Sequence, residues 1–242
     1  MKNILNDKPV DYFTQRGFQR HIMDYVSEED VRGKDVLDVG CGWGSFVKSV
    51  LRWDPRRVVG VDITAPDIET AKEHIKDPRA SFMVASALEL PFPDASFDTV
   101  SAWEVIEHVP KGTEAKLLSE ICRVLKPGGQ FYFSTPCKNV RSCAGDPAWW
   151  LIGHRHYSKN QIAKFAADAN FQIRDLSAWG DMYSIVAVLN MYIAKWIFKR
   201  SPFRMDYFND KIEQSLAKKD TGYAGLIGHF CKLPVSQNTK TL

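Results

Sequence analysis

A glycine-rich segment with an aspartate in front of it is the part of this sequence best suited to binding a small ligand. It reads Asp38-Val39-Gly40-Cys41-Gly42-Trp43-Gly44, between an apolar run and a helix-compatible segment. Glycines at a strand-to-helix turn let the backbone approach a ligand closely. The spacing is G-x-G-x-G rather than the G-x-G-x-x-G of dinucleotide sites, and Asp38 would repel a pyrophosphate but suits an ammonium group. The segment therefore favours a ligand with an amine over a dinucleotide.

A second carboxylate, Asp62, ends the next apolar run, about 20 residues beyond the glycines. A carboxylate at this position can accept hydrogen bonds from both hydroxyls of an adenosine ribose. The glycine segment and Asp62 together predict an adenosine-binding site.

Apolar runs alternate with helical patterns over residues 34–133, which is typical of successive βα units. Expected strands, rich in β-branched or aromatic residues, are 36–40, 57–62, 81–85, 97–103 and 130–135. Expected helices are 45–53, 66–76 and 113–125, the last followed by a break at Pro127-Gly128-Gly129. This order predicts an α/β fold with a doubly wound, mostly parallel sheet that binds its ligand at the carboxyl ends of the strands.

The flanking segments extend this sheet to seven strands within a single domain, 1–242. Residues 14–26 predict an amphipathic helix within an amino-terminal helical cover, 1–33, and residues 34–180 form the cofactor-binding core. After a long segment, 136–157, we expect a helix over 158–169 with Ser158 as its N-cap. Further strands are expected at 171–178 and 223–233, with a helical insertion or lid over 181–220 before the last strand, 221–235.

Composition excludes several classes of protein. With 45% hydrophobic and 25% charged residues in 242, the chain is neither disordered nor a polytopic membrane protein. The net charge of +3 is too small to favour nucleic acid as a partner. Five scattered cysteines without a C-x-x-C pair suit a reducing cytoplasm, and the first residues lack the pattern of a secretory signal. We expect a cytoplasmic protein, with peripheral membrane attachment left open.

Five motifs in order make the sequence resemble a class I, seven-strand S-adenosylmethionine-dependent methyltransferase. They are VLDVGCGWG, VVGVD, ALELPFPDASFDTV, EVIEHV and LKPGGQFYFSTP. The resemblance implies a Rossmann-like fold, S-adenosyl-L-methionine as cofactor and S-adenosyl-L-homocysteine as product. Within this family the sequence is similar to bacterial methyltransferases of quinone and surface-glycan pathways.

The resemblance also implies roles for individual residues. Positions matching Gly40, Gly42 and Gly44 line the cofactor, Asp38 lies near its methionine amino group, and Asp62 binds its ribose. Further cofactor-binding candidates are Cys41, Ile63, Ser86, Ala87, Leu88, Glu104 and Arg16. Ser86 stands where the family often has an aspartate for the adenine amino group, and its hydroxyl can still accept that hydrogen bond.

Methyl transfer to a hydroxyl needs an aligned acceptor and a group that removes its proton. His108, just after the fourth strand, is the candidate base, and the alternative is a structural histidine at a helix start. Glu107 could orient His108 or face solvent, and we expect it to face solvent. Substrate-side candidates are Tyr12, His154, His156 and Tyr157. No metal is expected, because no nearby carboxylate or cysteine pattern completes a ligand set with the H-x-H of residues 154–156.

Residues 182–198 are almost wholly apolar, and Lys199, Arg200 and Arg204 follow them. The segment is too short to span a bilayer, so it could lie in an anionic membrane interface, cover the substrate pocket or form a homodimer contact. No N-P-P-Y or D-P-P-Y motif follows the fourth strand, which favours O-methylation of a small, sugar-containing or lipid-linked acceptor over methylation of DNA bases.

Two other classes of function stay open at this point. One is a catalytically silent cofactor-binding module that acts by interaction. The other is a nicotinamide-dependent oxidoreductase, against which Asp38 and the G-x-G-x-G spacing argue.

Overall fold

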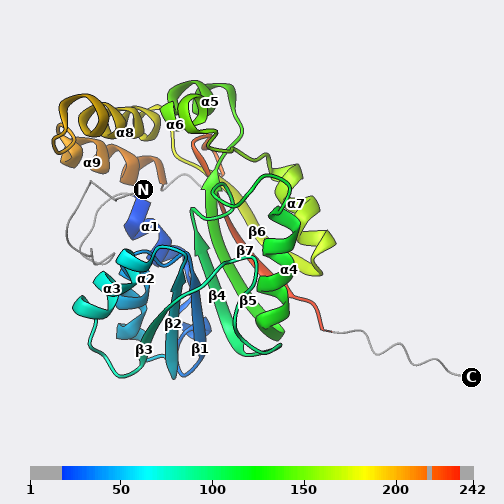
Figure 1. The fold of residues 1–242 in the computed structure, drawn as a ribbon. Coiled ribbons are helices and arrows are strands. Elements are labelled where there is room, and N and C mark those ends of the chain that lie inside the picture. Colours follow the sequence, from blue (N-terminus) through cyan, green and yellow to red (C-terminus); the bar gives the residue numbers. More distant parts are fainter. Residues whose placement is uncertain (1–17, 217–219, 235–242) are drawn as a thin grey trace, which may run out of the picture.

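The computed structural model describes residues 18–216 and 220–234. Its centre is a seven-stranded sheet in the order β3-β2-β1-β4-β5-β7-β6 (Figure 1). Strands β1 to β5 are parallel to one another. Strand β7 runs antiparallel to both β5 and β6. The predicted mostly parallel sheet is confirmed.

Six of the seven strands lie within one or two residues of the predicted bounds, and the exception is β5. The strands are β1 (Asp35–Val39), β2 (Arg57–Asp62), β3 (Ala80–Val84), β4 (Phe97–Trp103), β5 (Leu125–Pro136), β6 (Phe171–Trp179) and β7 (Gly225–Lys232). The α-helices are α1 (Phe18–Tyr25), α2 (Ser45–Val50), α3 (Ala65–His74), α4 (Glu114–Val124), α5 (Val140–Gly145), α6 (Pro147–Ile152), α7 (Lys159–Asp168), α8 (Met182–Ile193) and α9 (Met205–Leu216).

Strand β5 differs from its prediction because it begins at Leu125 and includes Pro127-Gly128-Gly129, the expected break. Its pairing with β4 shifts register between Phe97 and Thr99, so the Pro-Gly-Gly residues form an irregularity within the strand. The long segment 136–157 contains two short helices, α5 and α6.

Each face of the sheet buries its own apolar layer. Side chains of α1, α2 and α3 pack on one face, where Ile22, Phe46 and Ile68 are at most 2% exposed. Side chains of α4 and α7 pack on the other face, around Leu117 and Ile162. Because helices cover both faces, ligands have access at the strand ends.

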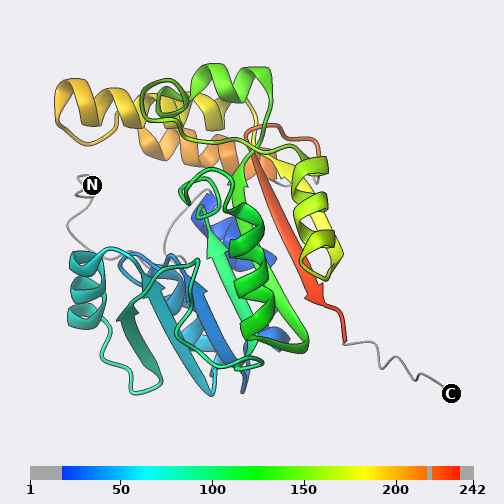
Figure 2. The ribbon, with the colours of Figure 1, turned by 45° about the vertical axis from the view of Figure 1, so that its right-hand side comes forward.

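Helices α5, α6, α8 and α9 gather beyond one end of the sheet, as both views show (Figures 1 and 2). Strands β4 and β5 end there, and α8 packs against α5 and α9. An 18-residue helix apolar enough to cross a membrane does not occur in the described part of the chain.

Candidate active site

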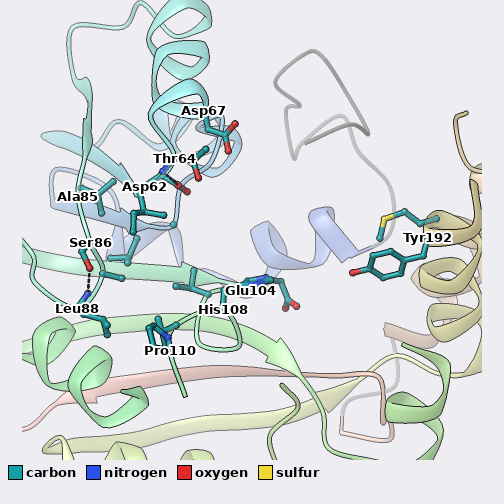
Figure 3. A pocket seen from close by; sticks show the side chains of 18 of the residues that line it. Asp62, Thr64, Asp67, Ala85, Ser86, Leu88, Glu104, His108, Pro110 and Tyr192 are labelled. Atoms are coloured by element: carbon teal, nitrogen blue, oxygen red, sulfur yellow. Dashed lines mark hydrogen bonds between the residues drawn. The ribbon is translucent and has the colours of Figure 1, made fainter. Parts of the chain in front are cut away.

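A cavity of about 580 Å³ opens at the carboxyl ends of β1, β2 and β4. Gly40 follows β1, Asp62 ends β2, and Glu104 follows β4. The ends of three adjacent strands therefore form one wall of the cavity (Figure 3). This is the place where open parallel sheets bind their ligands.

The glycine turn is shaped by close packing at two of its three positions. Gly40 has φ +72°, and a Cβ there would lie 2.5 Å from Cγ2 of Val105. Gly44 has φ +77°, and a Cβ there would lie 2.8 Å from side-chain atoms of Ile75 and Phe82. At Gly42, with φ +50°, a Cβ would meet no atom within 4 Å, so this backbone stays open to a ligand.

Asp62 holds the glycine turn and still has room for a ligand. One carboxylate oxygen accepts from the backbone N–H of Gly42 at 2.9 Å, and the other accepts from that of Thr64 at 2.8 Å. A carboxylate offers about four lone-pair positions, so two remain for hydroxyl donors. The cavity volume and this spare acceptor capacity fit an adenosine-containing cofactor.

Ser86 occupies the loop after β3. Its Oγ accepts from the backbone N–H of Leu88 at 3.2 Å, which closes a tight turn at the cavity wall (Figure 3). A hydroxyl oxygen has a second lone pair, so Ser86 retains one acceptor position for an adenine amino group.

Asp38, a predicted cofactor residue, is only 2% exposed and does not line the cavity. It accepts a hydrogen bond from Ser101 Oγ at 2.7 Å. Burial raises the pKa of Asp38 to about 7, even though this hydrogen bond opposes the rise.

Glu104 is held in an unusual conformation just after β4. Its φ of +54° lies in the left-handed region, and its backbone N–H lies 3.2 Å from both the carbonyl oxygen and Oγ of Ser134. A non-glycine residue in this region is strained, and such strain concentrates at functional sites. Burial raises the pKa of the Glu104 carboxyl.

The expectation that Glu107 faces solvent is wrong, because its side chain is fully buried. The turn after β4 carries it beneath the site, where its Oε2 accepts from Thr135 Oγ1 at 3.1 Å. Burial and the nearby Glu104 carboxyl raise the pKa of Glu107 well above its usual value.

His108 lies in a turn rather than at a helix start, and its side chain is 61% exposed. Partial desolvation, with the nearby His154 and Arg155, lowers its pKa to about 4. The imidazole is therefore neutral at physiological pH, and the lowered pKa makes it a weaker base than a free imidazole.

A second cavity of about 280 Å³ adjoins the first. Glu104, His108, Met191 and Tyr192 line both cavities, so they form the boundary between the two spaces. The arrangement can hold two molecules side by side at the ends of the strands.

A buried carboxylate stands beside the two predicted histidines of the second cavity. Oδ2 of Asp146 lies 2.7 Å from Nδ1 of His154 and 2.9 Å from Nε2 of His156. Burial pushes the pKa of Asp146 up, but these two hydrogen bonds outweigh it and hold the pKa below its usual range. The expectation that no carboxylate accompanies the H-x-H segment is wrong, because the chain returns through α6 and brings Asp146 to it.

Tyr157 does not contact either cavity, contrary to its prediction as a substrate residue. It is 3% exposed, and its hydroxyl donates to the carbonyl oxygen of Ile106 at 3.2 Å and accepts from Nε of Arg155 at 2.7 Å. The Arg155 guanidinium also bonds the carbonyl oxygens of Ile106 and Val109. Tyr157 and Arg155 therefore secure the turn that carries Glu104 and His108.

The remaining predicted residues differ in which of the two cavities they line. Those lining the first cavity are Gly40, Asp62, Ile63, Ser86, Ala87, Leu88, Glu104 and His108, while His154 and His156 line the second. Predicted cofactor residues that line neither cavity are Asp38, Cys41, Gly42 and Gly44. Tyr12 and Arg16 lie outside the described residues.

Helix α8 and the π-helical turn after it, Ala194–Phe198, supply site residues that the sequence motifs did not indicate. Met191, Tyr192 and Trp196 line the first cavity. In Figure 3 the Tyr192 side chain lies opposite Glu104 across the site. The apolar run predicted a helix, but no local motif specified which of its side chains face the cavity.

Two sequence relatives illustrate what the chain is similar to. A Mycolicibacterium smegmatis protein named "Probable S-adenosylmethionine-dependent methyltransferase" is 33% identical over 159 residues, which are 65% of this chain and 60% of that protein. A ubiquinone biosynthesis O-methyltransferase of Neisseria meningitidis serogroup C is 34% identical over 142 residues, or 56% of this chain and 58% of that protein. The matches thus span about three fifths of the length of these curated relatives.

The fold and a family match agree with these relatives. A solved S-adenosylmethionine-dependent methyltransferase from Mesorhizobium loti aligns with a TM-score of 0.64 over 88% of this chain and 97% of that chain, at 17% identity. Residues 36–129, from β1 into β5, match a family described as methyltransferase domain. Residues 36–129 thus match a methyltransferase domain, and the chain is similar to S-adenosylmethionine-dependent methyltransferases in sequence and in fold.

Proposed function

We propose that this protein transfers a methyl group from S-adenosylmethionine to a hydroxyl of a small, sugar-containing or lipid-linked acceptor. The observation that carries the proposal is the pair of adjoining cavities, whose shared wall includes Glu104 and His108. The first cavity takes the cofactor and the second takes the acceptor, so that the two reacting groups meet at this wall.

Residues of this chain would hold the cofactor at both of its ends. Asp62 accepts from the ribose hydroxyls, Ser86 accepts from the adenine amino group, and Glu104 pairs with the methionine amino group. When bound, S-adenosylmethionine supplies an electrophilic methyl group on a sulfonium. In-line displacement breaks the sulfur–methyl bond and forms the oxygen–methyl bond, while the acceptor hydroxyl gives up its proton.

The second cavity favours an uncharged acceptor that has hydroxyl groups. Its wall combines three carboxyls, Glu104, Glu107 and Asp146, with the aromatic rings of Trp179 and Tyr192. Buried carboxyls disfavour an anionic acceptor, whereas they accept hydrogen bonds from hydroxyls. The Neisseria relative is named as an O-methyltransferase, which supports oxygen as the methylated atom.

His108→Ala tests the cofactor and the proton acceptor together. We expect calorimetry to detect S-adenosylhomocysteine binding, and no NADH binding, for the wild type and for the variant. Turnover of the variant with a hydroxylated acceptor should fall by about 100-fold, because a general base typically contributes that factor or more. Binding of NADH alone would favour an oxidoreductase. Cofactor binding without turnover against acceptor-rich extracts would favour a silent module, and unchanged turnover of the variant would exclude His108 as the base.

The proposal of a lipid-linked acceptor draws on an exposed apolar and basic surface around the end of α8. Ile197, Phe198 and Phe203 are 68%, 59% and 62% exposed. The Arg200 guanidinium lies 5.0 Å and 5.9 Å from the ring centroids of Phe198 and Phe203, and that of Arg204 lies 5.3 Å from the Tyr207 ring centroid. Aromatic rings beside cations suit the interface of an anionic membrane.

Removing both cations, in Arg200→Ala/Arg204→Ala, should weaken binding to phosphatidylglycerol-containing vesicles. Each basic residue near an anionic surface contributes about 1 kcal/mol, so the expected loss is about 30-fold. Vesicle sedimentation measures it, with phosphatidylcholine vesicles as the neutral surface and the exposed pair Lys48→Ala/Lys76→Ala as the matched control. Equal binding to both kinds of vesicle would contradict the proposal. A concentration-dependent dimer that Phe198→Ser dissociates would assign this surface to a second copy instead.

A further inference from the structure

Three potential ligand side chains, Glu107, His108 and His154, cluster in the second cavity. Glu104 lines the same cavity, and Glu104 and His108 also line the first. One ligand atom each of Glu107, His108 and His154 lies within 4.8 Å of the other two, and Oε1 of Glu107 is 4.0 Å from Nε2 of His108. The rings of His108 and His154 have centroids 5.0 Å apart.

The carboxyls of Glu104 and Glu107 lack a compensating charge. Oε1 of Glu104 and Oε1 of Glu107 are buried and have no hydrogen-bond partner in the described part of the chain. Among the side chains that the structure describes, no lysine or arginine forms an ion pair with either carboxyl. Burying two acidic groups side by side is costly unless a cation or donor joins them.

The neighbouring group of Asp146, His154 and His156 also has metal-ligand spacing, but its hydrogen bonds occupy it. Oδ2 of Asp146 contacts both imidazoles, while Oδ1 accepts from the backbone N–H of Ala148 at 2.9 Å. Nδ1 of His156 lies 3.1 Å from the carbonyl oxygen of Cys137. These bonds orient His154 and leave its Nε2 for a further ligand.

An imidazole whose second nitrogen is fixed by a carboxylate is the usual support of a metal-binding histidine. Two ligands of one ion lie at most about 4.4 Å apart when each bond is about 2.0–2.2 Å long. The 4.0 Å separation of Glu107 Oε1 and His108 Nε2 already meets this condition.

We propose that Glu104, Glu107, His108 and His154 bind one divalent transition-metal ion at the boundary between the two cavities. Two imidazoles with two carboxylates suit ions such as Mn²⁺, Fe²⁺, Co²⁺ or Zn²⁺, whereas Mg²⁺ and Ca²⁺ prefer oxygen ligands. The ion supplies the positive charge that the two buried carboxyls lack.

The use of this ion in catalysis rests on the proposed function. Bound between the cavities, it would hold the acceptor hydroxyl and ease the loss of its proton to solvent. The oxygen then takes the methyl group, and the sulfur–methyl electron pair returns to sulfur. In this form of the mechanism His108 is a ligand rather than the base, and Glu104 is a ligand of the ion rather than the partner of the methionine amino group.

Titration of chelator-treated protein with Co²⁺ tests the site without any turnover. We expect one equivalent to bind and to produce a visible absorption band, and Mn²⁺ to compete for it. Glu107→Gln should weaken Co²⁺ affinity by about 100-fold, and Asp146→Asn, which acts through His154, by about 10-fold. Glu69→Gln carries the same chemical change as Glu107→Gln on the exposed side of α3 and should leave the affinity unchanged.

The outcomes separate this proposal from the proposed function. Absence of a Co²⁺ band in the wild type, or a Co²⁺ affinity unaffected by Glu107→Gln in a variant whose thermal unfolding is normal, would overturn the metal site. Full methyl transfer in the presence of a chelator would overturn the catalytic use of the ion alone. Metal binding without S-adenosylhomocysteine binding would instead contradict the proposed function. Turnover of His108→Ala that recovers at high Mn²⁺ identifies a ligand, because added metal cannot replace a lost base.

Discussion

Asp62→Ala is expected to weaken S-adenosylhomocysteine binding by more than about 100-fold. The carboxylate would lose two hydrogen bonds to ribose hydroxyls, and bonds to a charged group contribute about 1.5–3 kcal/mol each. It would also release the backbone N–H groups of Gly42 and Thr64, which it anchors at 2.9 and 2.8 Å. Calorimetric titration measures the dissociation constant.

Two further variants make this result interpretable. Asp62→Asn keeps one acceptor oxygen and should lose only about 10-fold in affinity. Asp168→Ala makes the same chemical change on the exposed end of α7, where the carboxylate pairs with Lys164, and should bind like the wild type. A dissociation constant that Asp62→Ala leaves unchanged would mean that the ribose does not lie at the end of β2.

Gly40→Ala should lower the free energy of unfolding by about 3 kcal/mol. A non-glycine residue in the left-handed region costs about 1–2 kcal/mol, and Gly40 has φ +72°. The added methyl would also lie 2.5 Å from Cγ2 of Val105, and such overpacking typically costs about 1–3 kcal/mol. Denaturant unfolding followed by circular dichroism measures the change.

Gly33→Ala separates the two causes. Gly33 has φ +67° and no atom within 4 Å of an added Cβ, so only the backbone cost of about 1 kcal/mol is expected. In the Gly40→Ala background, Val105→Ala should restore part of the lost stability because it removes the colliding methyl. Equal destabilisation by Gly40→Ala and Gly33→Ala would show that Val105 moves aside.

The parallel half of the sheet could be predicted because its signals are local. Strands buried on both faces read as short apolar runs, and the turn glycines and helix caps mark their ends. Ser158, for example, caps α7 together with Gln161, as its sequence position indicates. Strand β5 was placed too late because a Pro-Gly-Gly sequence normally ends regular structure, whereas here it lies within a paired strand.

The polar interior of the site could not be predicted in the same way. Whether Glu107 faces solvent or lies beneath Thr135 depends on the path of the turn after β4, which Arg155 secures from far along the chain. Asp146 precedes His154 by eight residues, and only the fold of α6 brings them into contact. Contacts of this kind have no periodicity, so sequence patterns indicate the cofactor side of the site better than the acceptor side.

The strand order lets the helical insertion between β6 and β7, which lines part of both cavities, change without disturbing the ends of the parallel strands. Strands β6 and β7 are antiparallel neighbours, and their pairing ends with Trp179 opposite Gly225. The whole helical insertion is therefore an enlarged hairpin loop whose two ends leave the sheet together. Lengthening such a loop costs little free energy. Evolution can thus exchange the helical insertion as a unit. Engineers can likewise graft a different insertion between Trp179 and Gly225 while Asp62 and the glycine turn stay unchanged.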